Sequence, residues 1–154
     1  MAGARKAVVR ALGTLACEGH EELFLDALTD RSPGVSNAAA RALQQRPLMS
    51  VAALLGIFRS DSPNFARKNV FRLLCRQPFW AEGIFLFEAV RDRDAAIVDL
   101  GLKGLSNRII RSRGIPSSPT KSELALLWSS LWASAGMLPT QQFRECEFAL
   151  KSYA

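Results

Sequence analysis

The sequence contains little of the chemistry on which catalytic and metal sites depend. It has one histidine in 154 residues, His20, and a single imidazole beside Cys17 and Glu21 does not complete a zinc site. No glycine-rich phosphate loop is present, and no nucleophile is placed beside His20. We therefore predict a protein that is not an enzyme and that holds no metal and no cofactor.

Cysteine is also scarce. The chain has three cysteines, Cys17, Cys75 and Cys146, which are widely spaced and lie in apolar surroundings. An odd number at such distances does not indicate a disulfide framework. We expect them to act as small buried hydrophobic residues in a reducing, cytoplasmic compartment.

Long hydrophobic runs are absent. The longest apolar stretch, residues 48–58, is shorter than the ~20 residues that a membrane-spanning helix needs, so we predict no contact with a membrane. Arg5, Lys6 and Arg10 lie among small apolar residues, as in a targeting segment. Arg10 is nevertheless in phase with a sequence repeat, which favours a structural role for this segment.

The chain does contain a repeat with a step of 31 residues. A basic residue, a small or apolar residue and a leucine recur at Arg10-Ala-Leu12, Arg41-Ala-Leu43, Arg72-Leu-Leu74 and Lys103-Gly-Leu105. Asp30, Asp61 and Asp92 keep the same step. A fixed step of this size is typical of stacked supersecondary units that bury their apolar faces against one another. The hydrophobic fraction of 49% is sufficient for such a continuous core.

Helical periodicity dominates within each unit, so we predict an all-α solenoid. The expected helices lie at about residues 4–17, 20–29, 33–45, 48–59, 64–76, 79–91, 94–112, 121–135 and 140–152. Ser32 is expected to cap the third of them before Pro33, and Pro47 and Pro78 stand where second helices must stop. Thr120 and Glu123 have the spacing of a capping box.

The pattern changes near the C-terminus. Gly114 to Pro119 interrupts the helices, and the repeat does not return after it. We predict three parts: helical repeats at 1–113, a linker at 114–120, and a helical hairpin at 121–154 that caps the last repeat. At the other end the chain opens on the second helix of a unit, which indicates a piece of a longer solenoid or self-association through an open N-terminal edge.

The repeats resemble HEAT repeats, in particular the short HEAT-like form of phycobilisome-lyase-type proteins. The resemblance rests on residues 24–35 followed by Ala38-Ala-Ala-Arg-Ala-Leu43, and on Val8-Val-Arg-Ala-Leu-Gly13. It covers about residues 4–113 and implies a right-handed α–α superhelix whose second helices line a concave face. The family often carries Arg where this chain has Ser36 and Ala66, although Arg67 could substitute in one unit.

The excess of positive charge falls on the repeats. Residues 1–113 hold 17 Lys and Arg against 11 Asp and Glu, whereas residues 114–154 hold three of each. If the repeated leucines face the core, a basic column points outward two residues before them; it consists of Arg10, Arg41, Arg72 and Lys103. Lys68 and Arg76 extend it by one helical turn. A basic stripe of this kind favours an acidic peptide or a phosphate backbone.

Three interpretations of the column stay open at this point. Its bases could be ordinary solvated residues that pair with acids such as Asp30, Asp61 and Asp92. They could bind an acidic protein partner. They could also bind nucleic acid, because the HEAT-like folds that the repeats resemble include DNA alkylpurine glycosylases, which hold a duplex on a basic concave face. No glycosylase set of acid, aromatic and base matches this sequence, and no aromatic residues interleave with the bases to stack nucleotides.

The tryptophans have two interpretations as well. Trp80, Trp128 and Trp132 are most simply packing residues. Trp128 and Trp132 are four residues apart and share a helix face, so they either seal the last repeat or form a patch for a partner.

We therefore predict a non-catalytic scaffold or adaptor that binds an acidic protein partner on a basic concave face. A nucleic-acid-binding domain of the DNA-repair type is the alternative. An enzyme of the bilin-lyase or hydroxylase kind ranks third, because the resemblance to those families lies only in the repeat scaffold.

Overall fold

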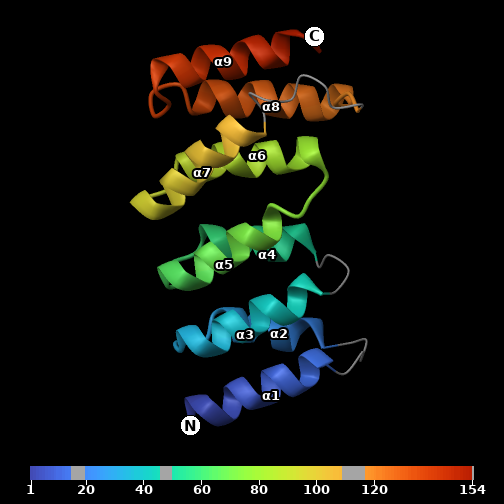
Figure 1. The fold of residues 1–154 in the computed structure, drawn as a ribbon, viewed down its shortest axis with the longest axis vertical. Coiled ribbons are helices and arrows are strands. Elements are labelled where there is room, and N and C mark those ends of the chain that lie inside the picture. Colours follow the sequence, from blue (N-terminus) through green and yellow to red (C-terminus); the bar gives the residue numbers. More distant parts are fainter. Residues whose placement is uncertain (15–19, 46–49, 109–116, 154) are drawn as a thin grey trace. The chain divides into compact units, whose positions relative to one another are not determined.

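The computed structural model describes residues 1–14, 20–45, 50–108 and 117–153. These residues form nine α-helices and no strand (Figure 1), which confirms the predicted all-α class. Several predicted features lie outside the described residues: the helix ends at 15–17 and 109–112, Pro47, Cys17, and residues 114–116 of the expected linker. None of the described helices has the length and apolarity needed to cross a bilayer.

The chain divides into two compact units. The first unit is Met1–Arg76 and the second is Gln77–Ala154. The prediction of repeats, linker and capping hairpin as three parts stays a prediction, and each unit is described by itself below.

The first unit is a two-layer stack of helices. Its helices are α1 (Ala2–Thr14), α2 (Glu21–Leu28), α3 (Pro33–Gln44), α4 (Val51–Arg59) and α5 (Asn64–Leu74). The second helices of the repeats form one layer, because α3 packs against both α1 and α5. The first helices form the other layer, where α2 packs on α3 and α4 packs on α5. Figure 1 shows this succession within the unit.

Apolar side chains at helical spacing hold the first unit together. Phe24 and Leu28 of α2 are fully buried, as are Val70 and Leu74 of α5. The short α3 contributes mainly alanines, which allow close packing of helix backbones, and its Leu43 is buried as predicted.

The second unit contains four helices. They are α6 (Phe79–Val90), α7 (Ala95–Asn107), α8 (Lys121–Ala133) and α9 (Thr140–Lys151). The helix α6 packs against α7 and α8, and α8 packs against α9. The predicted leucine at the third position of the repeat, Leu105, is fully buried here.

The 31-residue step appears directly in the helix boundaries. The first helices end at Leu28, Arg59 and Val90, and the second helices begin at Pro33, Asn64 and Ala95. Both sets advance by 31 residues, so the short turn within each repeat is the most regular feature of the chain.

An aspartate makes that turn in two of the three repeats. The Oδ1 atom of Asp30 accepts a hydrogen bond from the backbone N–H of Ser32 at 2.8 Å, and Asp92 accepts one from Asp94 at 2.7 Å. Ser32 occupies the N-cap position before Pro33, but its side chain makes no capping hydrogen bond. The expectation that the Ser32 side chain caps α3 was therefore wrong: Pro33 has no N–H, and the Val35 N–H donates to the Ser32 carbonyl oxygen at 3.0 Å rather than to its hydroxyl.

The turn before α5 is built differently. Two residues after Asp61 stands Pro63, which has no N–H to donate. The hydroxyl of Ser60 takes over, accepting from the Ser62 N–H at 3.2 Å. The turn within the repeat is therefore held by an aspartate carboxylate in two repeats and by a serine hydroxyl in the third.

The capping box at the start of α8 forms as predicted. The Glu123 N–H donates to Thr120 Oγ1 at 3.2 Å, and the Thr120 N–H donates to Glu123 Oε2 at 2.8 Å. This reciprocal pair satisfies two otherwise unpaired donors of the helix start.

The tryptophans divide into buried and exposed residues. Trp80 is buried and donates from Nε1 to the Ser117 carbonyl at 3.0 Å, which confirms its packing role. Trp132 is 58% exposed and meets only the ring of Phe143 edge-on. The expectation that Trp132 seals the last repeat was wrong; Leu127 and Leu131 of α8 carry the burial instead.

Candidate partner-binding surface

The second helices of the first unit carry positive charge without any negative charge. Their basic residues are Arg5, Lys6, Arg10, Arg41, Arg67, Lys68 and Arg72, and none of the three helices contains Asp or Glu. The neighbouring α2 has the opposite composition, with Glu21, Glu22 and Asp26 and no base. The acids of the described helices of the first unit are therefore confined to α2, since α4 carries one base, Arg59, and no acid.

Cross-helix hydrogen bonds show that α3 and α5 run side by side at the same level. Asn69 Nδ2 donates to Ser36 Oγ at 3.0 Å and to Asn37 Oδ1 at 2.8 Å. At the C-terminal ends of the two helices, Arg76 donates to the Leu43 carbonyl at 3.0 Å. Each contact joins residues 32 or 33 apart, close to the 31-residue step, so equivalent positions of the two repeats are neighbours.

The Asn69 network also fixes which face the arginines share. Asn69 Oδ1 accepts from Arg72 at 3.3 Å, so Arg72 and Asn37 flank the same asparagine. Arg41 follows Asn37 by four residues and lies on the same face of α3. Arg41 and Arg72 are both exposed, and they therefore stand next to each other on the surface of adjacent helices.

The first helix joins the same face. A Cβ atom added at Gly34 of α3 would lie 3.6 Å from Cδ of Lys6, which places the Lys6 side chain across the start of α3. Arg10 follows Lys6 by one helical turn, just as Arg41 follows Asn37. The structure thus brings Arg10, Arg41 and Arg72 together as an arginine row on three parallel helices.

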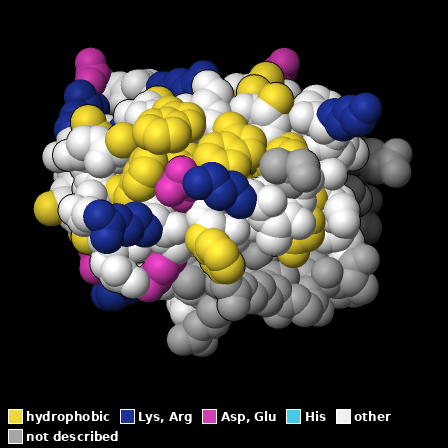
Figure 2. Space-filling model, turned by 90° about the horizontal axis from the view of Figure 1, so that it is seen from above, with side chains coloured by type: hydrophobic (Ala, Val, Ile, Leu, Met, Phe, Trp, Pro, Cys, Tyr) yellow, Lys and Arg dark blue, Asp and Glu magenta, His cyan; other side chains and the backbone are white. Residues whose placement is uncertain are grey.

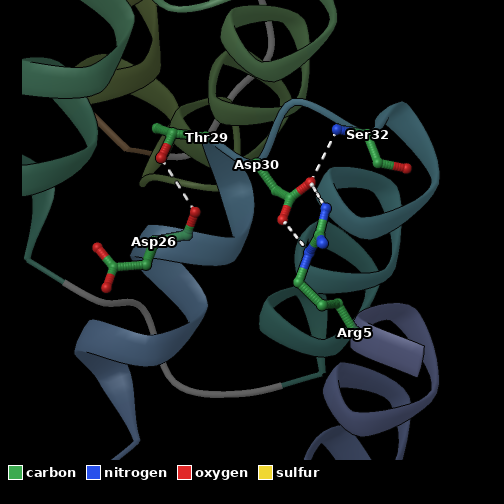
Figure 3. Close-up of polar contacts among 5 residues, drawn as sticks. All are labelled: Arg5, Asp26, Thr29, Asp30 and Ser32. Carbon is green, nitrogen blue, oxygen red and sulfur yellow. Dashed lines mark hydrogen bonds and ion pairs between the residues drawn. The ribbon is translucent and has the colours of Figure 1, made fainter. Parts of the chain in front are cut away.

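The acids of the unit do not neutralise this row. Among the described residues, no carboxylate forms an ion pair with Arg10, Arg41 or Arg72. The nearest repeat aspartate, Asp30, is occupied by Arg5: Nε lies 2.8 Å from Oδ2 and Nη2 lies 3.2 Å from Oδ1 (Figure 3).

The Arg5–Asp30 pair belongs to the framework of the repeat. The hydrogen bond from Arg5, followed by the one from the Ser32 N–H, holds the pKa of Asp30 below its ordinary value, and Asp30 raises the pKa of Arg5. Asp30 thus joins α1 to the turn before α3 (Figure 3).

Arg67 is basic but does not contribute to the surface. It is 4% exposed, its Nε donates to the Phe58 carbonyl at 3.0 Å, and its guanidinium lies 5.6 Å from the centre of the Phe58 ring. The side chain therefore ties α5 to the end of α4. Arg67 is the residue that the sequence suggested as a substitute for the family's arginine, and in the structure its role is to hold α4 and α5 together.

Lys103, the fourth predicted member of the basic column, lies on α7 in the second unit and has a partner. Its Nζ atom is 2.7 Å from Oδ2 of Asp99, one helical turn earlier. At the equivalent place in the first unit, α5 has Lys68 four residues before Arg72. Lys103 is therefore paired with an acid on its own helix, while for the arginine row the solvated interpretation and a binding role both stay predictions.

The two extensions of the column also have defined positions. Lys68 is half-buried on α5. Arg76 is exposed, and its hydrogen bond to the Leu43 carbonyl holds it at the end of α3. Both lie within one turn of Arg72 and enlarge the basic face.

Sequence reasoning missed Asn69, which organises this surface. The residue is 4% exposed, and its side-chain amide joins α3, α5 and Arg72. Its 31-residue equivalents are Ala7, Ala38 and Leu100. A polar residue in an otherwise apolar column is the signal that could have revealed it, because a buried amide needs partners.

The histidine and the cysteines that the sequence analysis considered do not form a defined site among the described residues. His20 stands at the start of α2, as predicted, and makes no capping hydrogen bond with its side chain. Within the described ranges, no three His, Cys, Asp or Glu residues gather as metal ligands. Cys146 is buried, and this burial raises the pKa of its thiol to about 12, which makes it an unreactive packing residue. Cys75 is half-buried.

The second unit also presents large apolar side chains on its surface. Large exposed hydrophobic residues of α8, α9 and their connection are Leu126, Trp132, Met137 and Phe148. Figure 2, which views the molecule from the end at which α9 lies in Figure 1, shows hydrophobic side chains grouped around a few charged ones.

Comparison with known proteins identifies the repeats. A family profile for HEAT repeats matches residues 2–75, which are almost the whole first unit. No curated protein and no solved structure matches the chain. The finer likeness to phycobilisome-lyase-type repeats stays a prediction.

Proposed function

Residues 2–75 are HEAT repeats, a fold that commonly serves as a scaffold for protein interactions, and on this premise we propose that the first unit is a non-catalytic interaction module. It binds an acidic segment of a partner protein on the face formed by α1, α3 and α5. The observation that carries the proposal is the arginine row, three exposed cations on adjacent helices that contain no acid.

Electrostatics favour such a partner. Three aligned cations without compensating acids create a positive potential that attracts negative charge and speeds encounter. Arg72 is also held by Asn69, so less side-chain freedom is lost when it forms an ion pair. Arginine additionally makes two parallel hydrogen bonds to a carboxylate, which lysine does not.

Nucleic acid is the weaker candidate for the same face. Stacking of bases requires exposed aromatic side chains. The three helices contain two aromatic residues, of which Phe71 is buried and Phe65 is half-buried.

The test is a fluorescence-anisotropy titration of the full chain with a labelled, flexible Glu-rich peptide and with a labelled random DNA duplex. We expect the peptide to bind at about 50 mM salt and to bind several-fold more weakly at about 200 mM. The variant Arg41→Ala/Arg72→Ala should weaken peptide binding by about tenfold or more. Arg31→Ala/Arg144→Ala is the matched control, because it removes the same charge from exposed positions outside the face.

Three outcomes contradict the proposal. The peptide does not bind even at low salt, the control variant weakens binding as much as the test variant, or the duplex binds more tightly than the peptide with a steep dependence on salt.

A further inference from the structure

We infer that the partner presents its acidic residues from an α-helix, with carboxylates repeated every seventh residue. The helix lies across α1, α3 and α5, so that one carboxylate faces each member of the arginine row. This inference rests on the proposed function and specifies the conformation and spacing of the partner segment.

The spacing of the row carries the inference. Arg10, Arg41 and Arg72 stand on adjacent packed helices at equivalent levels, and the axes of packed helices are about 8–10 Å apart. The carboxylates of a matching partner must therefore recur at about the same interval on one side of its chain. The hydrogen bonds of Asn69 keep α3 and α5 in register, and Lys6 of α1 lies beside the start of α3.

An α-helix meets this requirement. Seven residues advance about 10.5 Å along a helix and return to nearly the same face. An extended strand does not meet it, because its side chains share a face every second residue, at about 6.6–6.8 Å, and three residues bring a side chain to the opposite face.

A polyproline segment matches the interval at least as well as a helix, with about 9.3 Å for each turn of three residues, so the interval alone does not exclude it. Surfaces that bind such segments use grooves lined by exposed aromatic side chains. Phe65 and Phe71 are the aromatic residues of α1, α3 and α5, and neither is exposed. The face therefore suits a helix better than a proline-rich segment.

Arg41 has the central position in this arrangement. It lies between Arg10 and Arg72, and central contacts of an interface usually contribute most to binding because they are best shielded from water. Lys6 and Lys68 lie one turn before Arg10 and Arg72 on the same helices, α1 and α5, and add positive charge beside the row.

The test compares three labelled peptides of equal length and charge, titrated against the full chain at about 50 mM salt. The first is an Ala- and Gln-rich helix with three glutamates at a spacing of seven residues. The second has the same composition, with glutamates separated by five and nine residues, which moves them to different faces. The third is proline-rich with three glutamates spaced three residues apart. Circular dichroism must show that the first two are equally helical.

We expect the first peptide to bind about tenfold more tightly than the second and third, since each exposed ion pair adds about two- to fivefold. Arg41→Ala should weaken the first peptide more than Arg10→Ala does. Changing the middle glutamate of that peptide to glutamine should abolish the effect of Arg41→Ala, while changing a terminal glutamate should not.

The result that overturns the inference is equal binding of the first two peptides or tightest binding of the third. Either outcome leaves the proposed function standing, because an acidic segment still binds the face. Absence of binding by all three peptides, when the flexible Glu-rich peptide does bind, also overturns the inference alone. Absence of binding by every acidic peptide rejects the proposed function as well.

Discussion

The two units use the same repeat position for different purposes. On α5 of the first unit, Lys68 stands one turn before Arg72. Arg72 donates to Asn69 and, among the described residues, forms no ion pair with a carboxylate. On α7 of the second unit, Lys103 is preceded one turn earlier by Asp99, and the two side chains pair at 2.7 Å. The fold repeats across this step, but the surface charge does not.

The units also differ in what they leave exposed. The first presents an acid-free layer of helices with an arginine row. The second exposes large apolar side chains on and near α8 and α9, including Trp132 and Phe148. The family profile matches the first unit and ends at residue 75, so the part that keeps the family pattern is also the part with the basic face. Four sets of substitutions sharpen or break this comparison.

The largest effect is expected from Gly101→Ala in the second unit. A Cβ atom at Gly101 would lie 2.9 Å from the Val90 backbone nitrogen and 3.0 Å from the Leu86 carbonyl oxygen. Backbone atoms do not move aside cheaply, so α7 would have to withdraw from α6. We expect a loss of about 2–3 kcal/mol in the free energy of unfolding, measured by urea denaturation.

The matching change in the first unit, Gly13→Ala, should cost somewhat less, about 1–2 kcal/mol, because it makes one tight contact where Gly101 makes three. Its Cβ would meet the Ala42 Cβ at 2.8 Å, and an alanine Cβ moves only with its backbone, so α1 would have to shift away from α3. Gly56→Ala on α4 is the control, because nothing lies within 4 Å of the added atom, and it should stabilise the helix slightly. A greater cost at Gly13 than at Gly101 would show that α1 and α3 are the more tightly packed pair.

The next effect concerns helix starts. Thr120→Ala removes both hydroxyl contacts of the capping box and should cost about 1 kcal/mol. Ser32→Ala at the start of α3 should cost less than about 0.5 kcal/mol, because the Ser32 side chain makes no capping hydrogen bond. Thermal unfolding of both variants measures the difference, and equal losses would contradict the assigned turn geometry.

These helix starts also show how far sequence reasoning reaches. The starts at Pro33, Asn64 and Ala95 follow from local signals and from the repeat, and the predicted helix boundaries agree with the structure within about three residues at the described ends. Whether the N-cap side chain accepts a hydrogen bond was not predictable from the turn: the same aspartate turn precedes α3 and α7, yet the Asp94 side chain accepts from the Ala96 and Ile97 N–H groups and the Ser32 side chain accepts from none.

The candidate surface was predictable only in part. The exposed row followed from the leucines, because a residue two positions before a buried leucine points outward. The pairing of Lys103 with Asp99 was visible in the sequence as an i,i+4 spacing. The role of Asn69 was not, because its partners Ser36 and Asn37 are more than 30 residues away and become neighbours only when α3 and α5 pack.

A change of pH is expected to have a smaller effect on the free energy of unfolding, with opposite signs in the two units. Burial raises the pKa of Glu82 in α6 above its ordinary value of 4.5, and Arg108, 3.3 Å away, partly offsets this. The folded state then binds more protons than the unfolded state from pH 4.5 up to the raised pKa, so stability falls as pH rises through that window. Glu82→Gln should remove this slope.

Asp30 in the first unit has the opposite behaviour. Its pKa lies below the ordinary value of 3.8, so its contribution to stability is fully present above that value and is lost as pH falls through the lowered pKa. Asp30→Asn should therefore reduce the loss of stability on acidification below pH 3.8. Glu82→Gln should change the pH dependence of stability at higher pH, above 4.5. Urea midpoints measured across a pH series test both signs, and parallel curves for the two variants would contradict them.

The smallest effect is expected from Lys103→Ala. An exposed i,i+4 ion pair contributes about 0.3–0.5 kcal/mol, and alanine favours a helix at least as well as lysine, so stability should be nearly unchanged. Because Asp99 already pairs with Lys103, binding of an acidic peptide should also be unchanged, in contrast to Arg41→Ala. The two variants remove the same charge from the same repeat position. If Lys103→Ala weakened binding as much as Arg41→Ala does, the binding face could not be confined to the first unit, and the difference in surface charge between the units would have no consequence for the partner.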